Sequence, residues 1–317
     1  MVSSNAPSTL ETYSYGMNKF FLFRQSRGKP DWFSRDTTQG NIEDELLLFY
    51  SYYAVDRNYS HSTFHGWLYA IRKFHGNLGV NIDLTAMISL TAARQGWKRI
   101  AGPGQRTIAV TSEMIVEAID HGGLDLETWD GALRAMHLSL SMVNMLRAGE
   151  VLDTGSGPDP DKCLWVKNLI GFAGGGDTPA GPDEEVDELV QYQTTSKADQ
   201  GGAGAITNLF ADSNVSSACT VALFNRLRAI DPTFFTKANG DAFVFTLSSG
   251  AVLGVGPQEL LLKNAAARLG FQPAGISLHS LRAGGATAMW HAGFETYAIQ
   301  GRGRWRSDAY KTYIWEG

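Results

Sequence analysis

Two segments near the C-terminal end decide which fold this sequence can adopt: "HSLRAGGAT", residues 279–287, and "WRSDAYKTYI", residues 305–314. Their chemically active side chains are His279, Arg282, Trp305, Tyr310 and Tyr313. A hydrophobic core needs apolar residues at helical spacing, and a solvated face needs mixed charges. These segments show neither pattern, which indicates a functional site.

The first segment predicts a helix with Ser277 as its N-cap. His279 and Arg282 would then share a face close to the positive end of the helix dipole. An imidazole, a guanidinium and free backbone N–H groups together favour an oxyanion such as phosphate. Gly284 and Gly285 are each about 1 kcal/mol worse than Ala in a helix, so they predict that another segment packs closely there. Taken alone, the segment also fits a capped surface helix.

Two further segments add basic residues. Arg147 is expected inside a long apolar helix over residues 128–152, where a guanidinium needs a partner. Glu150, three residues further on, can orient it, although such a pair is also typical of a structural ion pair. Lys197 follows a predicted strand and begins the Gly-rich turn "KADQGGAG". Alone, a lysine at such a position is usually only solvated.

The composition is that of an ordinary globular protein, with 44% hydrophobic and 19% charged residues. No apolar run reaches the roughly 18 residues of a membrane span, and the N-terminus does not resemble a secretory signal. Cys163 and Cys219 form no CxxC pair, so we expect buried thiols in a reducing compartment and no structural zinc site. These features predict an intracellular protein, nuclear in a eukaryote or cytoplasmic in a bacterium or phage-infected cell.

The net charge of −5 is unevenly distributed. Residues 1–107 hold 12 Lys and Arg against 8 Asp and Glu, whereas the acidic Gly/Pro-rich stretch 174–188 holds much of the negative charge. No acid occurs between Asp83 and Glu113. The basic residues of that interval include Lys98, Arg99 and Arg106, for which we predict DNA binding. On charge alone, an ordinary acidic enzyme remains an alternative.

The pattern of elements predicts a mainly α protein with a small antiparallel β-sheet in its second domain, an α+β fold. Residues 1–101 are expected to form a helical domain whose aromatic residues are core, including Phe49, Phe64 and Trp67. Residues 102–110 are expected to be a basic linker, and residues 111–317 a second domain carrying the 174–188 insertion. Strands are predicted within "KCLWVKNLIGF" and "VDELVQYQTT", and the absence of a βαβ alternation argues against a Rossmann sheet.

In combination and in this order, "MLRAGEVL", "SKADQGGAG", "HSLRAGGAT" and "GRWRSDAYKTYI" resemble the landmarks of the tyrosine recombinase (phage integrase) family. The last of them is similar to versions in eukaryotic retrotransposons and some phages. The resemblance covers nearly the whole chain. It implies a helical core-binding domain over residues 1–101 and a catalytic domain over residues 111–317.

The resemblance implies six catalytic residues: Arg147, Lys197, His279, Arg282, Trp305 and Tyr313. Tyr313 would attack a DNA phosphate and form a 3′-phosphotyrosine, while the two arginines hold the non-bridging oxygens. Lys197 would protonate the leaving 5′-oxygen, and His279 would exchange a proton with the nucleophile or the phosphate. Trp305 stands where the family has His or Trp, and its indole N–H can donate to the phosphate. Glu150 would support Arg147.

The same resemblance implies a site-specific recombinase or integrase of a mobile element. Its partner would be double-stranded DNA, bound by a homo-tetramer on two DNA sites, with no cofactor, no metal and no membrane. A type IB topoisomerase that relaxes supercoils, and a DNA-binding relic without turnover, are the alternatives. Between the two tyrosines, spacing favours Tyr313 as the nucleophile and gives Tyr310 a packing role.

Overall fold

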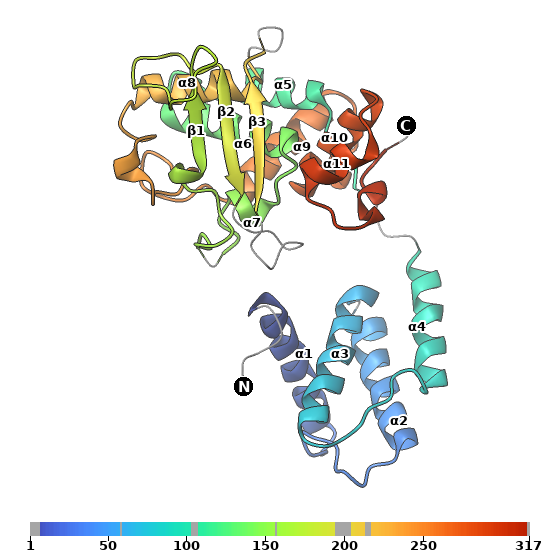
Figure 1. The fold of residues 1–317 in the computed structure, drawn as a ribbon. Coiled ribbons are helices and arrows are strands. Elements are labelled where there is room, and N and C mark those ends of the chain that lie inside the picture. Colours follow the sequence, from blue (N-terminus) through green and yellow to red (C-terminus); the bar gives the residue numbers. More distant parts are fainter. Residues whose placement is uncertain are drawn as a thin grey trace. The chain divides into compact units, whose positions relative to one another are not determined.

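The computed structural model describes residues 7–57, 59–102, 107–155, 157–193, 204–212 and 217–315. The chain forms two compact units, residues 1–104 and 105–317. Residues 103–106, within the expected linker, lie outside the described residues. The described part is mainly helical and has one small antiparallel sheet, so the predicted fold class is confirmed (Figure 1).

The first unit is a helical bundle built around aromatic side chains. Its elements are α1 (Pro7–Ser26), α2 (Gln39–Tyr50), a π-helical turn (Ser51–Asp56), α3 (His61–Asn77) and α4 (Ile88–Ala101). Thr38 caps α2 and Ser60 caps α3 through their side-chain oxygens, which fixes where both helices begin. Phe49, Phe64 and Trp67 are fully buried, as their helical spacing predicts.

The second unit contains the sheet, in the order β1-β2-β3. Strands β1 (Leu169–Phe172), β2 (Glu188–Gln193) and β3 (Ala205–Phe210) pair antiparallel throughout. The first predicted strand is shorter than expected, because Val166–Asn168 forms a 3-10 turn before it. The sequence pattern did not reveal β3, because two of its apolar side chains, Ile206 and Phe210, lie on the exposed face.

The acidic stretch 174–188 connects β1 to β2 and is anchored by hydrogen bonds. The carboxylate of Asp187 accepts from the amide of Gly174 at 2.8 Å. Arg228, on α8, donates to the carbonyl oxygens of Glu184 and Gly181. The connection is therefore attached to a neighbouring helix through its backbone.

Helices complete the second unit, and the C-terminal ones, shown in red in Figure 1, position the predicted site. They are α5 (Ser112–Asp120), α6 (Trp129–Val143), α7 (Ala148–Val151), α8 (Thr220–Ile230), α9 (Val255–Arg268), α10 (His279–His291) and α11 (Thr296–Gly303). Short 3-10 turns lie at Lys237–Asn239, Pro273–Gly275 and Asp308–Thr312. The main core of the unit is formed by apolar residues of α5, α6, α8 and α9 together with the sheet.

Two details of the predicted helices are wrong. Helix α6 ends at Val143 and the chain turns through Met145, whose φ of 48° is left-handed, so Arg147 lies outside that helix and precedes α7. Helix α10 starts at His279 itself, after Leu278, and Ser277 does not cap it with its side chain. The hydroxyl of Ser280 instead accepts from the amide of Ser277 at 3.0 Å.

The glycine pair of α10 lies against two backbone segments, as predicted. A Cβ atom on Gly284 would stand 2.1 Å from the carbonyl oxygen of Val110, and one on Gly285 would stand 2.2 Å from that of Met142. No side chain fits at either distance. The glycines therefore let α10 approach α6 closely, and that approach brings Arg282 next to the turn at Met145.

Candidate active site

The nucleophile candidate, Tyr313, follows the short 3-10 helix Asp308–Thr312, which Ser307 caps. Its ring is half-buried and lies 5.0 Å, between ring centroids, from both His279 and Trp305. The carbonyl of Tyr313 accepts from the hydroxyl of Thr287, and the same hydroxyl accepts from the amide of Trp315. These bonds fix the tail against α10 and keep the phenol beside the imidazole.

Tyr310 has a different environment, although it is only three residues away. It is 3% exposed and belongs to a small core with Met145, Ala286, Ile299 and Ile314. Its ring therefore packs beneath the segment that carries Tyr313. This placement agrees with the packing role that spacing suggested for it.

Arg282 is the most buried cation of the site, with no solvent exposure. Its guanidinium donates to the carbonyl oxygens of Met145 and Gly303 and stacks 4.1 Å above the centroid of the Trp305 ring. Burial lowers the pKa of Arg282 to about 10, with further lowering from the nearby charges of Arg147 and Arg304. At neutral pH it is still a cation, so the interior of the site holds a charge.

Arg147 is held by Glu150 in two ways. The backbone N–H of Arg147 donates to Glu150 Oε2 at 2.8 Å, and its Nη1 donates to Oε1 at 3.0 Å. About a quarter of the Arg147 side chain remains exposed, whereas Glu150 is buried. Arg147 can therefore present its remaining N–H groups to a ligand while the carboxylate fixes its orientation.

Arg304 is a site residue that the sequence patterns did not reveal. It pairs with Glu150 Oε2 at 2.7 Å, so one carboxylate holds both Arg147 and Arg304. Its φ of 57° is left-handed, as is that of Met145, whose carbonyl accepts from both Arg304 and Arg282. Two strained residues therefore meet where the guanidinium groups converge. The available signal was the "GRGRW" run, in which Arg304 lies between Gly303 and Trp305.

His279 begins α10; its side chain is partly open to solvent but crowded by neighbouring groups, and it has no hydrogen-bond partner within the described part of the chain. Burial by surrounding groups lowers the pKa of its imidazole, and the positive charges of Arg282 and Arg147 lower it further. These effects favour the neutral imidazole, which is able to accept a proton. Trp305 supplies the ring under Arg282, and its indole N–H has no partner among the described residues.

The charges of this cluster do not balance. Three guanidinium groups, on Arg147, Arg282 and Arg304, face one carboxylate, Glu150, which leaves a formal surplus of two positive charges. Among the described groups that shift the pKa of Arg282, Glu150 is the one carboxylate. A partly buried surplus of this kind stabilises a bound anion, and phosphate oxygens suit guanidinium donors.

The remaining predicted residues lie elsewhere or outside the described chain. Lys197 and Arg106 fall in the segments 194–203 and 103–106, which are not among the described residues. Lys98 and Arg99 lie in the last turn of α4 in the first unit, and both are exposed.

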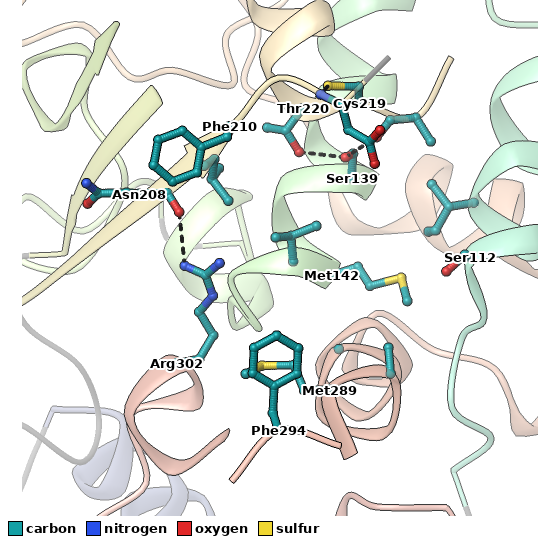
Figure 2. A pocket seen from close by; sticks show the side chains of 17 residues that line it. Ser112, Ser139, Met142, Asn208, Phe210, Cys219, Thr220, Met289, Phe294 and Arg302 are labelled. Carbon is teal, nitrogen blue, oxygen red and sulfur yellow. Dashed lines mark hydrogen bonds between the residues drawn. The ribbon is translucent and has the colours of Figure 1, made fainter. Parts of the chain in front are cut away.

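The second unit also has a cavity of about 450 Å³, which is lined by residues other than those of this cluster. Figure 2 shows the side chains that line it. It lies between β3, α6 and α10, and none of the predicted site residues that the structure describes lines it. Arg302 points across it toward the backbone oxygen of Asn208, and the hydroxyls of Ser139 and Thr220 meet at its edge (Figure 2). Its walls are mostly apolar, which does not suit a phosphate.

The described residues contain neither a metal-binding cluster nor a membrane-spanning helix. In that part of the chain, no group of three or more His, Cys, Asp or Glu side chains is placed to hold a metal ion. Nor does any helix of that part combine the length and apolarity needed to cross a bilayer.

No family model matches this sequence, and no curated protein matches it. Solved structures do share its fold. A XerH site-specific recombinase bound to a palindromic difH substrate has a TM-score of 0.63 at 13% identity, over 97% of this chain and 76% of that one. The Tn1549 transposon integrase in complex with transposon right end DNA has a TM-score of 0.56 at 9% identity, over 99% of this chain and 91% of that one.

A lambda integrase tetramer bound to a Holliday junction gives a TM-score of 0.55 at 13% identity, over 100% of this chain and 76% of that one. The chain therefore has the fold of the tyrosine recombinases.

Proposed function

We propose that this protein is a site-specific DNA recombinase or integrase that cleaves and rejoins strands through a 3′-phosphotyrosine. The observation that carries the proposal is the convergence of Tyr313, His279 and Trp305 on the buried charge of Arg282. A phenol beside a neutral imidazole and a surplus of guanidinium charge is the set of groups that phosphoryl transfer to tyrosine needs.

In the proposed reaction, the Tyr313 oxygen attacks the phosphorus of a DNA phosphodiester. A bond forms between that oxygen and phosphorus, and the bond to the 5′-oxygen breaks. Arg147 and Arg282 stabilise the charge on the non-bridging oxygens, with the indole N–H of Trp305 as a further donor. His279 takes the phenolic proton, and Lys197, by the resemblance, returns a proton to the 5′-oxygen.

The phosphotyrosine keeps the energy of the broken bond, so the reverse attack by a 5′-hydroxyl from another strand completes recombination without a nucleotide cofactor. We propose that the partner is double-stranded DNA and that four copies of this protein assemble on two DNA sites. The reaction would take place inside the cell that carries the mobile element. The tetramer of lambda integrase on a Holliday junction is consistent with this assembly, since that protein has the same fold. The similarity of "GRWRSDAYKTYI" to retrotransposon and phage versions supports a mobile-element origin.

The test uses the DNA that flanks the gene, supplied as two labelled duplexes and, separately, as a supercoiled plasmid. A recombinase exchanges strands between the duplexes and gives products that carry both labels. Relaxation of the plasmid with no exchange would point instead to topoisomerase-like activity. Binding without any covalent adduct would identify a relic that has lost turnover.

A further inference from the structure

Arg304 lies at the end of α11 in a backbone conformation that arginine rarely adopts. It is the C-cap residue of that helix, and its φ of 57° and ψ of 40° are left-handed. Glycine is the usual residue at such a helix end, because a side chain is disfavoured there. A left-handed arginine therefore persists only where its side chain makes contacts that outweigh the strain.

The shortest polar contact of the Arg304 side chain within the described chain is with Glu150. Its Nη2 lies 2.7 Å from Oε2 of that carboxylate, whereas its bonds to the carbonyl oxygens of Asn144 and Met145 are longer, at 3.3 and 3.5 Å. Burial lowers the pKa of Arg304, and the charge of Glu150 raises it. The carboxylate therefore stabilises a cation that burial alone would disfavour.

Arg304 itself is poorly placed to bind a DNA phosphate. Only 8% of its side chain is exposed, against 26% for Arg147. Its two Nη atoms donate to Glu150 and to the two carbonyl groups, and its Nε is buried without a partner among the described residues. Of the two arginines that share Glu150, Arg147 is therefore the one that can reach a ligand.

The shared carboxylate decides how much of the Arg147 charge a phosphate meets. Glu150 accepts from the backbone N–H and from Nη1 of Arg147, so these two residues alone would form a neutral pair. Arg304 brings a second cation to the same carboxylate. The three residues together keep one net positive charge, which acts more strongly in a partly buried site than in water.

We propose that Arg304 is a positioning residue that neutralises Glu150, so that Arg147 is held in place and still presents its positive charge to the scissile phosphate. This inference rests on the function proposed above and adds a residue to it. Arg304 acts through Glu150 and Arg147 rather than by contact with the phosphate. Its loss should reduce cleavage by about 10- to 100-fold, the range for groups that orient metal ligands.

The first experiment measures cleavage of a nicked duplex by Arg304→Gln and by the double variant Arg304→Gln/Glu150→Gln. The charged groups of the cluster carry two net positive charges in the wild type, one in the single variant and two again in the double variant. We expect the added Glu150→Gln to restore cleavage by roughly tenfold, within the range for coupled residues of one ion-pair network. A double variant that cleaves no faster than Arg304→Gln would overturn the proposal.

The matched control is Arg302→Gln, which removes a cation from the same helix. The guanidinium of Arg302 points toward the backbone oxygen of Asn208 (Figure 2). This variant should cleave like the wild type, and Arg304→Lys, which keeps the charge, should cleave faster than Arg304→Gln. Where thermal melting shows that Arg304→Gln does not fold, Arg304→Gly replaces it, because glycine adopts a φ of 57° without strain.

A second arm measures the same charge without DNA cleavage. Sulfate is titrated into the wild type and both Gln variants, and binding is followed by NMR through the imidazole resonances of His279, which lies close enough for Arg282 and Arg147 to lower its pKa. Arg304→Gln should bind sulfate several-fold more weakly, and the added Glu150→Gln should restore the affinity. Equal affinity in the wild type and Arg304→Gln would overturn the proposal.

The two arms separate this inference from the proposed function. If the wild type forms no covalent adduct with DNA, the recombinase function fails, and the sulfate arm still decides whether Arg304 supplies the charge. If the wild type forms the adduct and Arg304→Gln cleaves at the same rate, the role of Arg304 is overturned and the function stands.

Discussion

At the scale of single residues, Arg147 and Arg282, the two arginines proposed to hold the phosphate, differ in how much of the structure depends on them. Arg282 is fully buried and satisfies the carbonyl oxygens of Met145 and Gly303. Arg147 is partly exposed and contacts one carboxylate. We therefore expect removal of Arg282 to disturb the fold and removal of Arg147 to leave it largely intact.

Substitution of Arg147 by Ala should lower DNA cleavage by roughly 10²–10³, the scale for losing one preorganised charge donor, with little change in thermal unfolding. Arg282→Ala should also lower the melting temperature, because the buried carbonyl of Gly303 loses its donor, at about 1–3 kcal/mol, and the carbonyl of Met145 keeps only the longer bond from Arg304. Cleavage rates and thermal melts of both variants check this. Normal cleavage by Arg147→Ala would show that this residue does not hold the phosphate.

At the scale of elements, the packing of α10 depends on its glycines. Gly284 has no room for a methyl group beside Val110, whereas Gly301 on α11 has open space around it. The two positions lie in helices of the same unit. They therefore form a matched pair that separates close packing from helix propensity.

Gly284→Ala should destabilise the second unit by about 1–3 kcal/mol, because the added methyl group forces α10 away from its neighbour. Gly301→Ala should be neutral or stabilising by up to about 1 kcal/mol, the helix propensity gained. Urea unfolding of the two variants measures the difference. Equal stabilities would show that α10 does not approach the 107–111 segment as closely as the structure places it.

His137 on α6 makes the stability of the second unit depend on pH. It is fully buried, burial lowers its pKa to about 3, and Gln258 donates to its Nδ1 at 2.7 Å. The unfolded chain binds this proton near pH 6.5, so the free energy of unfolding falls as the pH drops from about 6.5 toward 3.

Between pH 7 and pH 5, the wild-type protein should therefore lose about 2 kcal/mol more stability than His137→Gln, which has no proton to take up. The measurement is urea unfolding at both pH values. The comparison uses only the change with pH, so a constant cost of the substitution cancels. Parallel losses in both proteins would show that His137 is not the group responsible.

The sequence was a good guide to elements with a regular apolar period and a poor one to turns. The stripes through Phe49 and Trp67 predict buried helices because burial follows the period. Strand β3 was not predicted, because its exposed face carries two apolar residues, Ile206 and Phe210. The turn at Met145 has no sequence signal, since a left-handed Met is fixed by tertiary contacts rather than by local preference.

The candidate site likewise could be predicted only in part. The spacing of His279 and Arg282 and the order of the motifs were enough to predict the residues that meet around Tyr313. Arg304 was not predicted, because it joins the site by sharing the carboxylate of Glu150 with Arg147. The spacing of residues along the sequence does not show that two cations share one carboxylate. Glu150 was predicted to orient Arg147, and the structure adds that it holds a second cation.

At the scale of the whole molecule, the basic charge of the first 107 residues contrasts with an acidic remainder. The exposed Lys98 and Arg99 at the end of α4 belong to this basic part. An overall charge of −5 therefore does not exclude binding to DNA, because binding depends on the local surface.

The double variant Lys98→Gln/Arg99→Gln should bind DNA more weakly and with a flatter salt dependence. Each phosphate contact that is lost should reduce the slope of log K against log salt by about 0.9. Adding Arg106→Gln tests the segment outside the described residues. A slope identical to that of the wild type would place this basic surface away from the DNA.

The most direct test of the central claim is the identity of the tyrosine that becomes attached to DNA. A nicked substrate that traps the cleaved strand is incubated with wild-type protein, Tyr313→Phe and the matched variant Tyr310→Phe, and the adduct is mapped by peptide mass spectrometry. Tyr313→Phe keeps the ring that packs beside His279 and removes only the attacking oxygen. We predict an adduct on Tyr313 in the wild type and in Tyr310→Phe, and none in Tyr313→Phe. An adduct on Tyr310, or one that persists in Tyr313→Phe, would contradict the mechanism.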